Sequence, residues 1–174
     1  YKVRLCVGGW WSEILLDSYF PVMATAPAFL CLKTSRAEVW PMLIQKAYAK
    51  TVDGFRYGSL TSGDGMNAIE DITGRPGSRY DDKVKEAALD PNHDDAKTLF
   101  TKLAAWCASG DLLVASTMGY GEADETFYDN TCLTVENSYA VLAMRHFEAE
   151  DIRLVRVRVP FGQSDQWTGP WSDG

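Results

Sequence analysis

With 174 residues, 46% of them hydrophobic, the chain has the size and apolar content of one globular domain. Its formal net charge of −7 argues against a nucleic-acid partner, because binding to a phosphate backbone depends on clustered lysines and arginines. No run approaches the roughly 20 apolar residues that a membrane span requires, so we expect a soluble domain without a membrane span.

A β-hairpin is predicted at the start of the chain. Apolar and polar residues alternate over residues 2–7, Gly8 and Gly9 supply a turn, and residues 10–16 resume the extended pattern.

The first predicted helix follows a loop rich in Ala, Pro and Thr. Ser35 and Glu38 have the spacing of a capping box, and apolar side chains then recur every three to four residues up to Tyr48. Pro41 is tolerated only in a first turn, so the helix is expected to begin closer to Glu38 than to Ser35.

A second, short helix is predicted from Met66 to Ile72, with Gly74 as its stop. Residues 75–95 are polar and carry Pro-Gly and Asp-Pro breakers, so we interpret them as an exposed excursion without regular structure. Apolar side chains at helical spacing between Leu99 and Cys107 predict the next helix, which Gly110 would end.

The last third of the chain has the pattern of strands. Residues 112–117 predict a buried strand, and residues 138–147 and 152–159 predict two long strands joined by the acidic turn 148–151. Strands that pair locally around a few helices indicate an α+β fold with an antiparallel sheet.

Three stretches resemble segments of the calpains, papain-like cysteine proteases whose core is split into two halves around a substrate cleft. The stretch Glu38-Val-Trp-Pro-Met-Leu-Ile-Gln-Lys-Ala-Tyr-Ala-Lys50 is similar to the family's Glu-x-Trp-x-x-Leu-x-x-Lys-Ala-Tyr-Ala-Lys helix. Ala68-Ile-Glu-Asp-Ile-Thr-Gly74 resembles its Gly-Phe-x-Asp-Phe-Thr-Gly segment. Arg158-Val-Pro-Phe-Gly162 and Trp167-Thr-Gly-Pro-Trp-Ser-Asp173 resemble its Arg-Asn-Pro-Trp-Gly and Trp-Thr-Gly-x-Trp-Ser-Asp.

The resemblance implies that residues 1–174 form one subdomain, the second half of a calpain protease core, excised from a longer protein. That half would be an antiparallel sheet or open barrel with flanking helices. The family's nucleophile belongs to a Gly-x-Cys-Trp segment of the first half, and no cysteine here has those neighbours. The cysteines also lack zinc-ligand spacing, which favours reduced, mostly buried thiols: Cys6, Cys31, Cys107 and Cys132.

Two catalytic positions of the family are replaced. Asn137 stands where the resemblance places the histidine, and Val159 where it places the orienting asparagine. An amide does not exchange protons near pH 7, and a valine offers no side-chain hydrogen bond. The other histidines, His93 in the charged excursion and His146 near the far end of the strand that follows Asn137, are not expected to substitute.

The family's calcium dependence suggests a cation site near the end of the chain. Asp173 matches one of the carboxylate ligands that the resemblance implies, while Gln166 replaces another and Asp165 lies one residue earlier. A solvated acidic loop remains the competing interpretation, since calcium takes six to eight oxygens. Phe161 and Trp167 are expected to flank the old cleft, where they could grip a peptide without cutting it.

The sequence therefore favours a non-catalytic calpain-like subdomain that acts as a binding or scaffolding module for a protein or peptide, with the upstream half of the core as its partner in the parent chain. One alternative is a part of a calcium-dependent cysteine endopeptidase whose nucleophile lies upstream. A second alternative is a calcium-sensing module. A cytoplasmic location is expected, with association to cytoskeleton or membrane through other parts of the parent protein left open.

Overall fold

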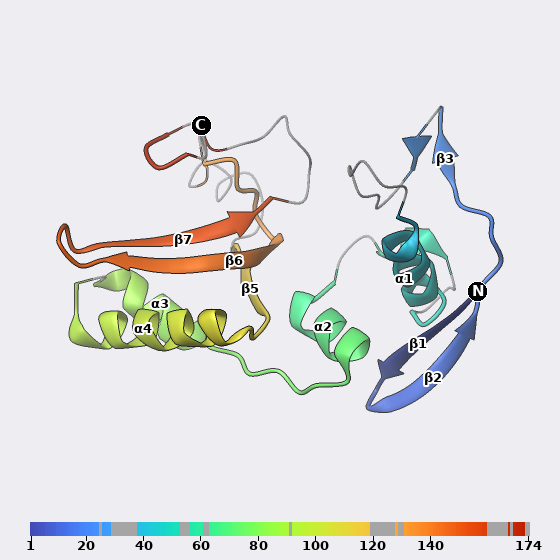
Figure 1. The fold of residues 1–174 in the computed structure, drawn as a ribbon, viewed down its shortest axis with the longest axis horizontal. Coiled ribbons are helices and arrows are strands. Elements are labelled where there is room, and N and C mark those ends of the chain that lie inside the picture. Colours follow the sequence, from blue (N-terminus) through green and yellow to red (C-terminus); the bar gives the residue numbers. More distant parts are fainter. Residues whose placement is uncertain are drawn as a thin grey trace. The chain divides into compact units, whose positions relative to one another are not determined.

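The computed structural model describes residues 1–24, 26–28, 38–52, 56–60, 63–90, 92–118, 128, 131–159, 167 and 169–172. Residues 1–77 and residues 78–174 form two compact units, each with its own helices and strands (Figure 1). That the whole chain makes up one subdomain of a protease core stays a prediction.

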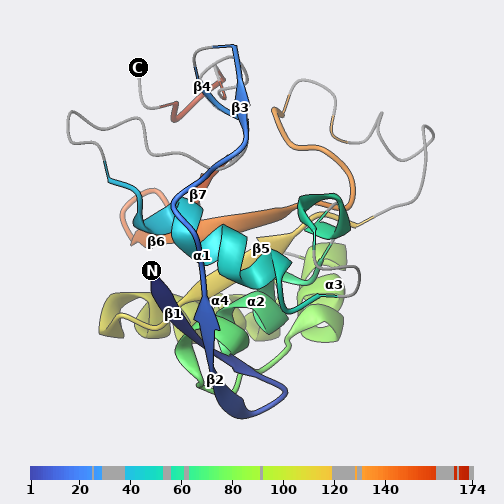
Figure 2. The ribbon, with the colours of Figure 1, turned by 90° about the vertical axis from the view of Figure 1, so that its right-hand side faces the viewer.

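The predicted N-terminal hairpin is confirmed. β1 (Lys2–Val7) pairs antiparallel with β2 (Trp10–Leu15), in a register that runs from Lys2 opposite Leu15 to Val7 opposite Trp10. Gly8 and Gly9 have φ angles of +59° and +84°, a left-handed pair that suits glycine and matches the twist of a two-residue hairpin turn. Figure 2 shows β2 leading on to β3 (Val22–Met23), which pairs with β4 (Ala26–Pro27).

The first helix, α1 (Trp40–Ala49), begins later than the capping-box spacing suggested. Its N-cap residue is Val39, which makes no side-chain cap hydrogen bond, and Ser35 lies outside the described residues. Pro41 accordingly falls in the first turn, where its missing N–H leaves no intrahelical hydrogen bond unmade. The sequence correctly indicated a start nearer Glu38 than Ser35.

The short helix α2 (Gly65–Thr73) follows η1 (Tyr57–Leu60) and is capped at both ends by its own sequence. The Asp64 carboxylate accepts hydrogen bonds from the N–H groups of Met66 and Asn67, at 2.8 and 3.3 Å. Gly74 ends the helix at φ +68°, as predicted, and the Trp11 ring lies where a Cβ at Gly74 would be. This glycine therefore serves both the helix end and the contact with the hairpin.

The core of residues 1–77 joins the hairpin to α1. Leu5, Leu16 and Ala47 are buried together, and a ring of partly buried side chains surrounds them. That ring comprises Val3, Val7, Ile14, Leu43 and Tyr48. The alternation along β1 and the helical spacing along α1 thus point their apolar faces at each other, as the sequence indicated.

In residues 78–174 the predicted excursion over residues 75–95 is wrong in part. Its exposure is confirmed, but it contains the helix α3 (Asp81–Leu89) and the start of α4 (Asp94–Ser109). Acidic residues in the first turn of each helix interact favourably with the positive end of the helix dipole. The rest of α3, Lys-Val-Lys-Glu-Ala-Ala-Leu, consists mostly of good helix formers. The charged residues of this range therefore mark the solvated face of a helix and not a loop.

α4 ends as predicted at Gly110, at φ +90°, and leads into a three-stranded antiparallel sheet of order β5-β6-β7. The strands are β5 (Leu113–Ser116), β6 (Ser138–Phe147) and β7 (Ile152–Arg158). α4 packs along β6, and α3 lies beside α4 (Figure 1). The expectation of a buried strand before residue 117 is corrected, because β5 is an edge strand with only Leu113 half-buried.

The fold class is confirmed as α+β. The described residues contain four α-helices and antiparallel sheets that do not close into a barrel. Among the described helices, none combines the length and the apolar character needed to cross a membrane.

Candidate functional site

The two positions at which the sequence predicts replaced catalytic residues lie at one end of the three-stranded sheet. Asn137 directly precedes β6, and Val159 directly follows β7, whose last residue Arg158 pairs with Ala140. Thr117 follows β5 at the same end, because Ser116 pairs with Ser138. Since neighbouring strands are antiparallel, the start of β6 lies beside the ends of β5 and β7.

The Asn137 side chain is held by the turn that precedes β6. Its Nδ2 donates to Thr134 Oγ1 at 2.6 Å and to the Val135 carbonyl at 2.9 Å, which uses both amide hydrogens. The Asn137 backbone N–H donates to Thr117 Oγ1 at 3.0 Å, and its carbonyl accepts from the Thr117 N–H at 2.9 Å. The side-chain amide thus holds the turn together, and the Asn137 backbone joins the turn to Thr117, the residue after β5.

Tyr139 completes this polar cluster from inside the unit. Its side chain is 2% exposed, and its hydroxyl accepts a hydrogen bond from the Thr134 N–H at 2.8 Å. Thr134, Asn137 and Tyr139 therefore bind one another at the head of β6, and no buried side-chain nitrogen or oxygen of the described residues lacks a partner.

Val159 is half-buried and brings no hydrogen-bonding side chain to this end of the sheet. With an engaged amide at Asn137 and a hydrocarbon at Val159, the two positions supply neither a base nor a group to orient one. Neither of these two side chains can therefore act as a general base at neutral pH.

Both histidines of the chain have other roles. His93 is exposed and is the N-cap of α4, where its Nδ1 accepts the Asp95 N–H at 3.2 Å. His146 lies near the opposite end of β6 from Asn137, with its Nε2 2.9 Å from Asp151 Oδ1. The hydrogen bond with His146, together with the charge of Arg153, holds the pKa of Asp151 below its ordinary value.

Of the predicted cleft and metal residues, the structure describes Trp167 alone. Its indole Nε1 donates to the Pro170 carbonyl at 2.8 Å, and its ring occupies the space where a Cβ of Gly169 would lie. Trp171 of the same segment stacks on Phe147, with ring centroids 6.1 Å apart. The segment is thus folded by its own aromatic residues. The other three residues lie outside the described part: Phe161, Asp165 and Asp173.

The calcium prediction stays a prediction. Within the described part of the chain, no three His, Cys, Asp or Glu side chains gather closely enough to hold a metal ion. Of the described cysteines, Cys6 is buried and Cys107 and Cys132 are half-buried, while Cys31 lies outside the described residues. Their reduced state stays a prediction.

Sequence reasoning missed the part that Lys46 plays in the fold. Lys46 is buried, and its ammonium donates to Asp17 Oδ1 and to the Tyr19 carbonyl, each at 2.5 Å. The hydrogen bond from Lys46 holds the pKa of Asp17 below its ordinary value. Lys50 donates to the Leu15 carbonyl at 2.9 Å. The two lysines of the Lys-Ala-Tyr-Ala-Lys stretch therefore tie α1 to the hairpin and to the chain that follows it.

Tyr48, between those lysines, links two of the family-like stretches to each other. Burial raises the pKa of the Tyr48 hydroxyl, and its hydrogen bond with Asp71 of α2 raises it further. The helix stretch and the Asp-Ile-Thr-Gly stretch are thus joined directly in space. The spacing within each stretch gave no signal for this contact.

Comparison with known proteins identifies the family of the chain. The family signature of calpain family cysteine protease matches residues 1–174. The chain is 31% identical over 176 residues to the calpain-type cysteine protease DEK1 of Arabidopsis thaliana, an alignment that covers 99% of this chain and 8% of that protein. It is also 29% identical to calpain-5 and 30% identical to calpain-9 of Mus musculus, which cover 95% and 94% of this chain.

The chain spans only part of these relatives, 26% of calpain-5 and 22% of calpain-9. The match nevertheless extends over the whole of its own length. The chain belongs to the calpain family of cysteine proteases.

Proposed function

We propose that this chain is a non-catalytic calpain-like subdomain that serves as a binding or scaffolding module. The observation that carries the proposal is the sheet end where Asn137 and Val159 meet. Both hydrogens of the Asn137 amide are used within its own turn, and Val159 offers no partner for a catalytic imidazole.

The chemistry of a cysteine protease explains why the residues at positions 137 and 159 support a loss of catalysis. An imidazole must take the thiol proton and later return a proton to the leaving amine, and a third group must orient that imidazole. Loss of a general base lowers the rate by about 10²–10⁴-fold. His93 and His146, engaged at the N-cap of α4 and with Asp151, are not placed to replace it.

Peptide binding requires no proton-transferring or nucleophilic group, unlike peptide cleavage. Main-chain hydrogen bonds and pockets for side chains suffice to hold an extended segment. Aromatic side chains on the surface of residues 78–174, Trp167 and Trp171 among them, provide apolar area of the kind that such binding uses. A protein or peptide partner is therefore the class of ligand that we assign to the module.

Covalent labelling of the full-length protein that carries this chain tests the proposal. The protein is incubated with an epoxide cysteine-protease inhibitor, with and without calcium, and every cysteine adduct is located by mass spectrometry. We expect no calcium-dependent adduct above the background of a denatured sample. A calcium-dependent adduct on one cysteine, abolished by Asn137→Ala, would show an activated thiol and would overturn the proposal in favour of a calcium-dependent endopeptidase.

A paired variant sharpens this test. Asn137→His with Val159→Asn restores the two side chains that the family uses, whereas Asn137→Gln with Val159→Ala changes the same positions without supplying a base. If a nucleophile is present upstream, labelling should appear in the first double variant and stay absent in the second. Equal labelling of both would mean that these positions do not control the thiol.

The calcium-sensing alternative is separated by a measurement that does not involve the thiol. A ligand that binds only the folded state stabilises it by an amount that grows with the logarithm of the ligand concentration relative to Kd, and so raises the melting temperature. On the binding-module proposal, millimolar calcium leaves the melting temperature unchanged. A rise that is lost on Asp165→Asn with Asp173→Asn would establish the calcium site that the sequence suggested.

A further inference from the structure

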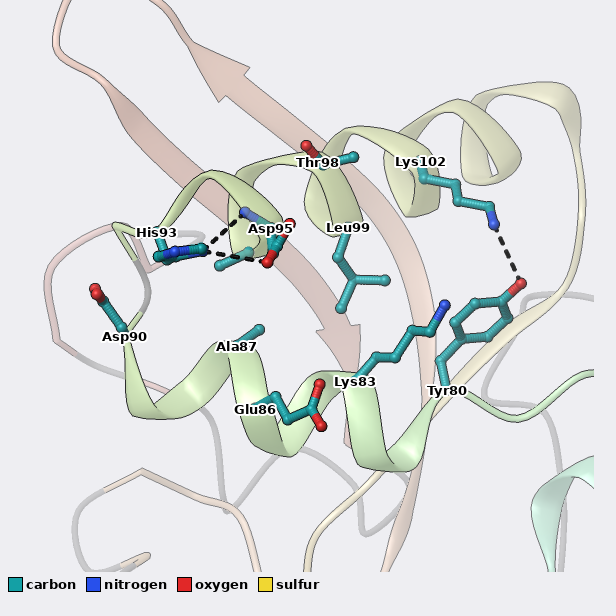
Figure 3. Close-up of a pocket in the computed structure, with 11 residues that line it drawn as sticks. Tyr80, Lys83, Glu86, Ala87, Asp90, His93, Asp95, Thr98, Leu99 and Lys102 are labelled. Atoms are coloured by element: carbon teal, nitrogen blue, oxygen red, sulfur yellow. Dashed lines mark hydrogen bonds and ion pairs between the residues drawn. The ribbon is translucent and has the colours of Figure 1, made fainter.

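A groove runs between α3 and α4, lined by side chains from both helices (Figure 3). Its volume is about 610 Å³, within the range of sites that bind ligands. Leu99 of α4 and Ala87 of α3 point toward each other across the groove and give it an apolar floor. Charged side chains stand at both of its ends.

The basic end is formed by Tyr80, Lys83 and Lys102. The Lys102 ammonium lies 5.2 Å from the centroid of the Tyr80 ring and 4.7 Å from that of Trp106, and the Lys83 ammonium lies 5.7 Å from Tyr80. Neither ammonium lies within 4 Å of a carboxylate of a described residue. In a chain of net charge −7, this is a local concentration of unneutralised positive charge held by two aromatic rings.

The acidic end is formed by Asp90 and Asp95, with Glu86 between the two ends. Asp90 accepts the Asn92 N–H at 3.2 Å, and Asp95 lies in the first turn of α4, so both also serve the local fold. Glu86 has no ion-pair partner among the described residues. Figure 3 shows Asp90, His93 and Asp95 gathered at the end of the groove away from Tyr80 and Lys102.

The geometry of α3 sets the separation of these charges. Lys83 and Ala87 lie one turn apart on the side of α3 that lines the groove, and Asp90 is the residue directly after the helix. At 1.5 Å per residue, Lys83 lies about 9 Å along the axis from Leu89, the last residue of α3, and its ammonium extends farther away, toward the Tyr80 ring. A partner that complements both ends must carry an acidic and a basic group separated by more than that distance.

We propose that the α3–α4 groove binds a peptide segment of a partner protein that carries an acidic and a basic residue on one face, more than about 10 Å apart. In an extended chain, side chains an even number of residues apart share a face, and four residues span about 13 Å, as in Glu-x-x-x-Arg or the reverse order. The acidic residue meets Lys83 and Lys102, the basic residue meets Asp90 and Asp95, and small apolar residues between them lie over Ala87 and Leu99. This surface goes beyond the loss of catalysis and does not depend on it.

Four peptides test the charge pattern against the full-length protein. Each is a fluorescein-labelled nine-residue Gly/Ala peptide, and they differ only at two positions four residues apart, which share one face of an extended chain: Glu and Arg, Arg and Glu, Glu and Glu, or Arg and Arg. Fluorescence anisotropy at low salt is expected to show the two mixed peptides binding at least about fivefold more tightly than the two uniform ones, since like charges at one end repel. If none of the four binds with a Kd below about 1 mM, the proposal is wrong.

A matched pair of lysines on α3 shows whether the effect belongs to the groove. Lys83→Glu should weaken binding of the mixed peptides about fivefold and shift the preference toward the Arg and Arg peptide. Lys85→Glu makes the same charge change on the same helix, at an exposed residue that does not line the groove, and should leave the order of affinities unchanged. Equal effects of the two variants would mean that the peptides respond to net charge alone, which overturns the proposal. Neither outcome depends on the inhibitor labelling.

Discussion

The two compact units use family-like residues in opposite ways. In residues 1–77, Lys46 and Tyr48 are built into contacts that join helix to hairpin and helix to helix. In residues 78–174, the two residues predicted to replace catalytic side chains are Asn137 and Val159, and the first of these secures a turn. The family-like residues of the first unit therefore contribute to its folding, whereas the proposal of lost catalysis depends on the second unit.

The physical reason for the contrast lies in what each side chain supports. Removal of Lys46 would leave the Tyr19 carbonyl without this donor, and the Asp17 carboxylate would keep only the hydrogen bond from the Tyr19 N–H that the structure shows. At the head of β6, in contrast, Thr134 and Val135 accept both hydrogens of the Asn137 amide. An asparagine at this position is therefore compatible with the fold.

The largest effect is expected from the core of the first unit. Leu5 is 1% exposed and Leu15, on the partner strand, is 66% exposed. Leu5→Ala should lower the free energy of unfolding by about 3 kcal/mol through lost burial and a residual cavity, whereas Leu15→Ala should change it by less than about 0.5 kcal/mol. Hydrogen exchange of peptides covering β1 and β2, read by mass spectrometry, measures both. Similar losses in the two variants would contradict the core described for residues 1–77.

A smaller effect is expected at the sheet end of the second unit. Tyr139→Phe removes the hydroxyl that accepts the Thr134 N–H, and should destabilise the head of β6 by about 1–2 kcal/mol because a partly buried donor is left unpaired. Tyr19→Phe, at a side chain 82% exposed, is the matched control and should have no measurable effect. Faster exchange confined to peptides around residues 131–141 is the expected signature. Unchanged exchange there would mean that the polar cluster does not hold the turn.

The smallest effect is a dependence on pH in the acid range. The pKa of Asp17 is lowered from 3.8, chiefly by its hydrogen bond from Lys46, so the ionised form stabilises the folded state. This contribution is present above pH 3.8, and it is lost as the pH falls through the lower folded-state pKa. In urea unfolding, the difference between wild type and Asp17→Asn should therefore be present at pH 6 and shrink below pH 3.8. A stability difference that grows as the pH falls would contradict the predicted direction of the pH dependence.

Local patterns in the sequence predicted most of the regular elements. The hairpin at Gly8 and Gly9, the stop of α2 at Gly74 and the stop of α4 at Gly110 depend on backbone angles that glycine adopts easily, so they could be read from neighbouring residues. α3 was not predicted because charged residues occur both in loops and on the exposed face of a helix. The exposure of β5 was missed because an apolar run does not reveal whether a strand lies at the edge of a sheet.

The candidate site was predictable only in part. The resemblance pointed to Asn137 and Val159, but the engagement of the Asn137 amide with Thr134 and Val135 required the structure. The same holds for the groove between α3 and α4, since one of its two walls was not predicted at all.

By itself, the sequence determined the fold class, the family likeness and the absence of an imidazole at position 137, because periodicity and residue type are properties of the chain. Only the tertiary structure decided that Asn137 and Val159 lie at one sheet end, that Tyr48 contacts Asp71, and that lysines and carboxylates stand at opposite ends of one groove. Contacts between residues far apart in sequence depend on strand pairing and helix packing, and no local pattern specifies those partners.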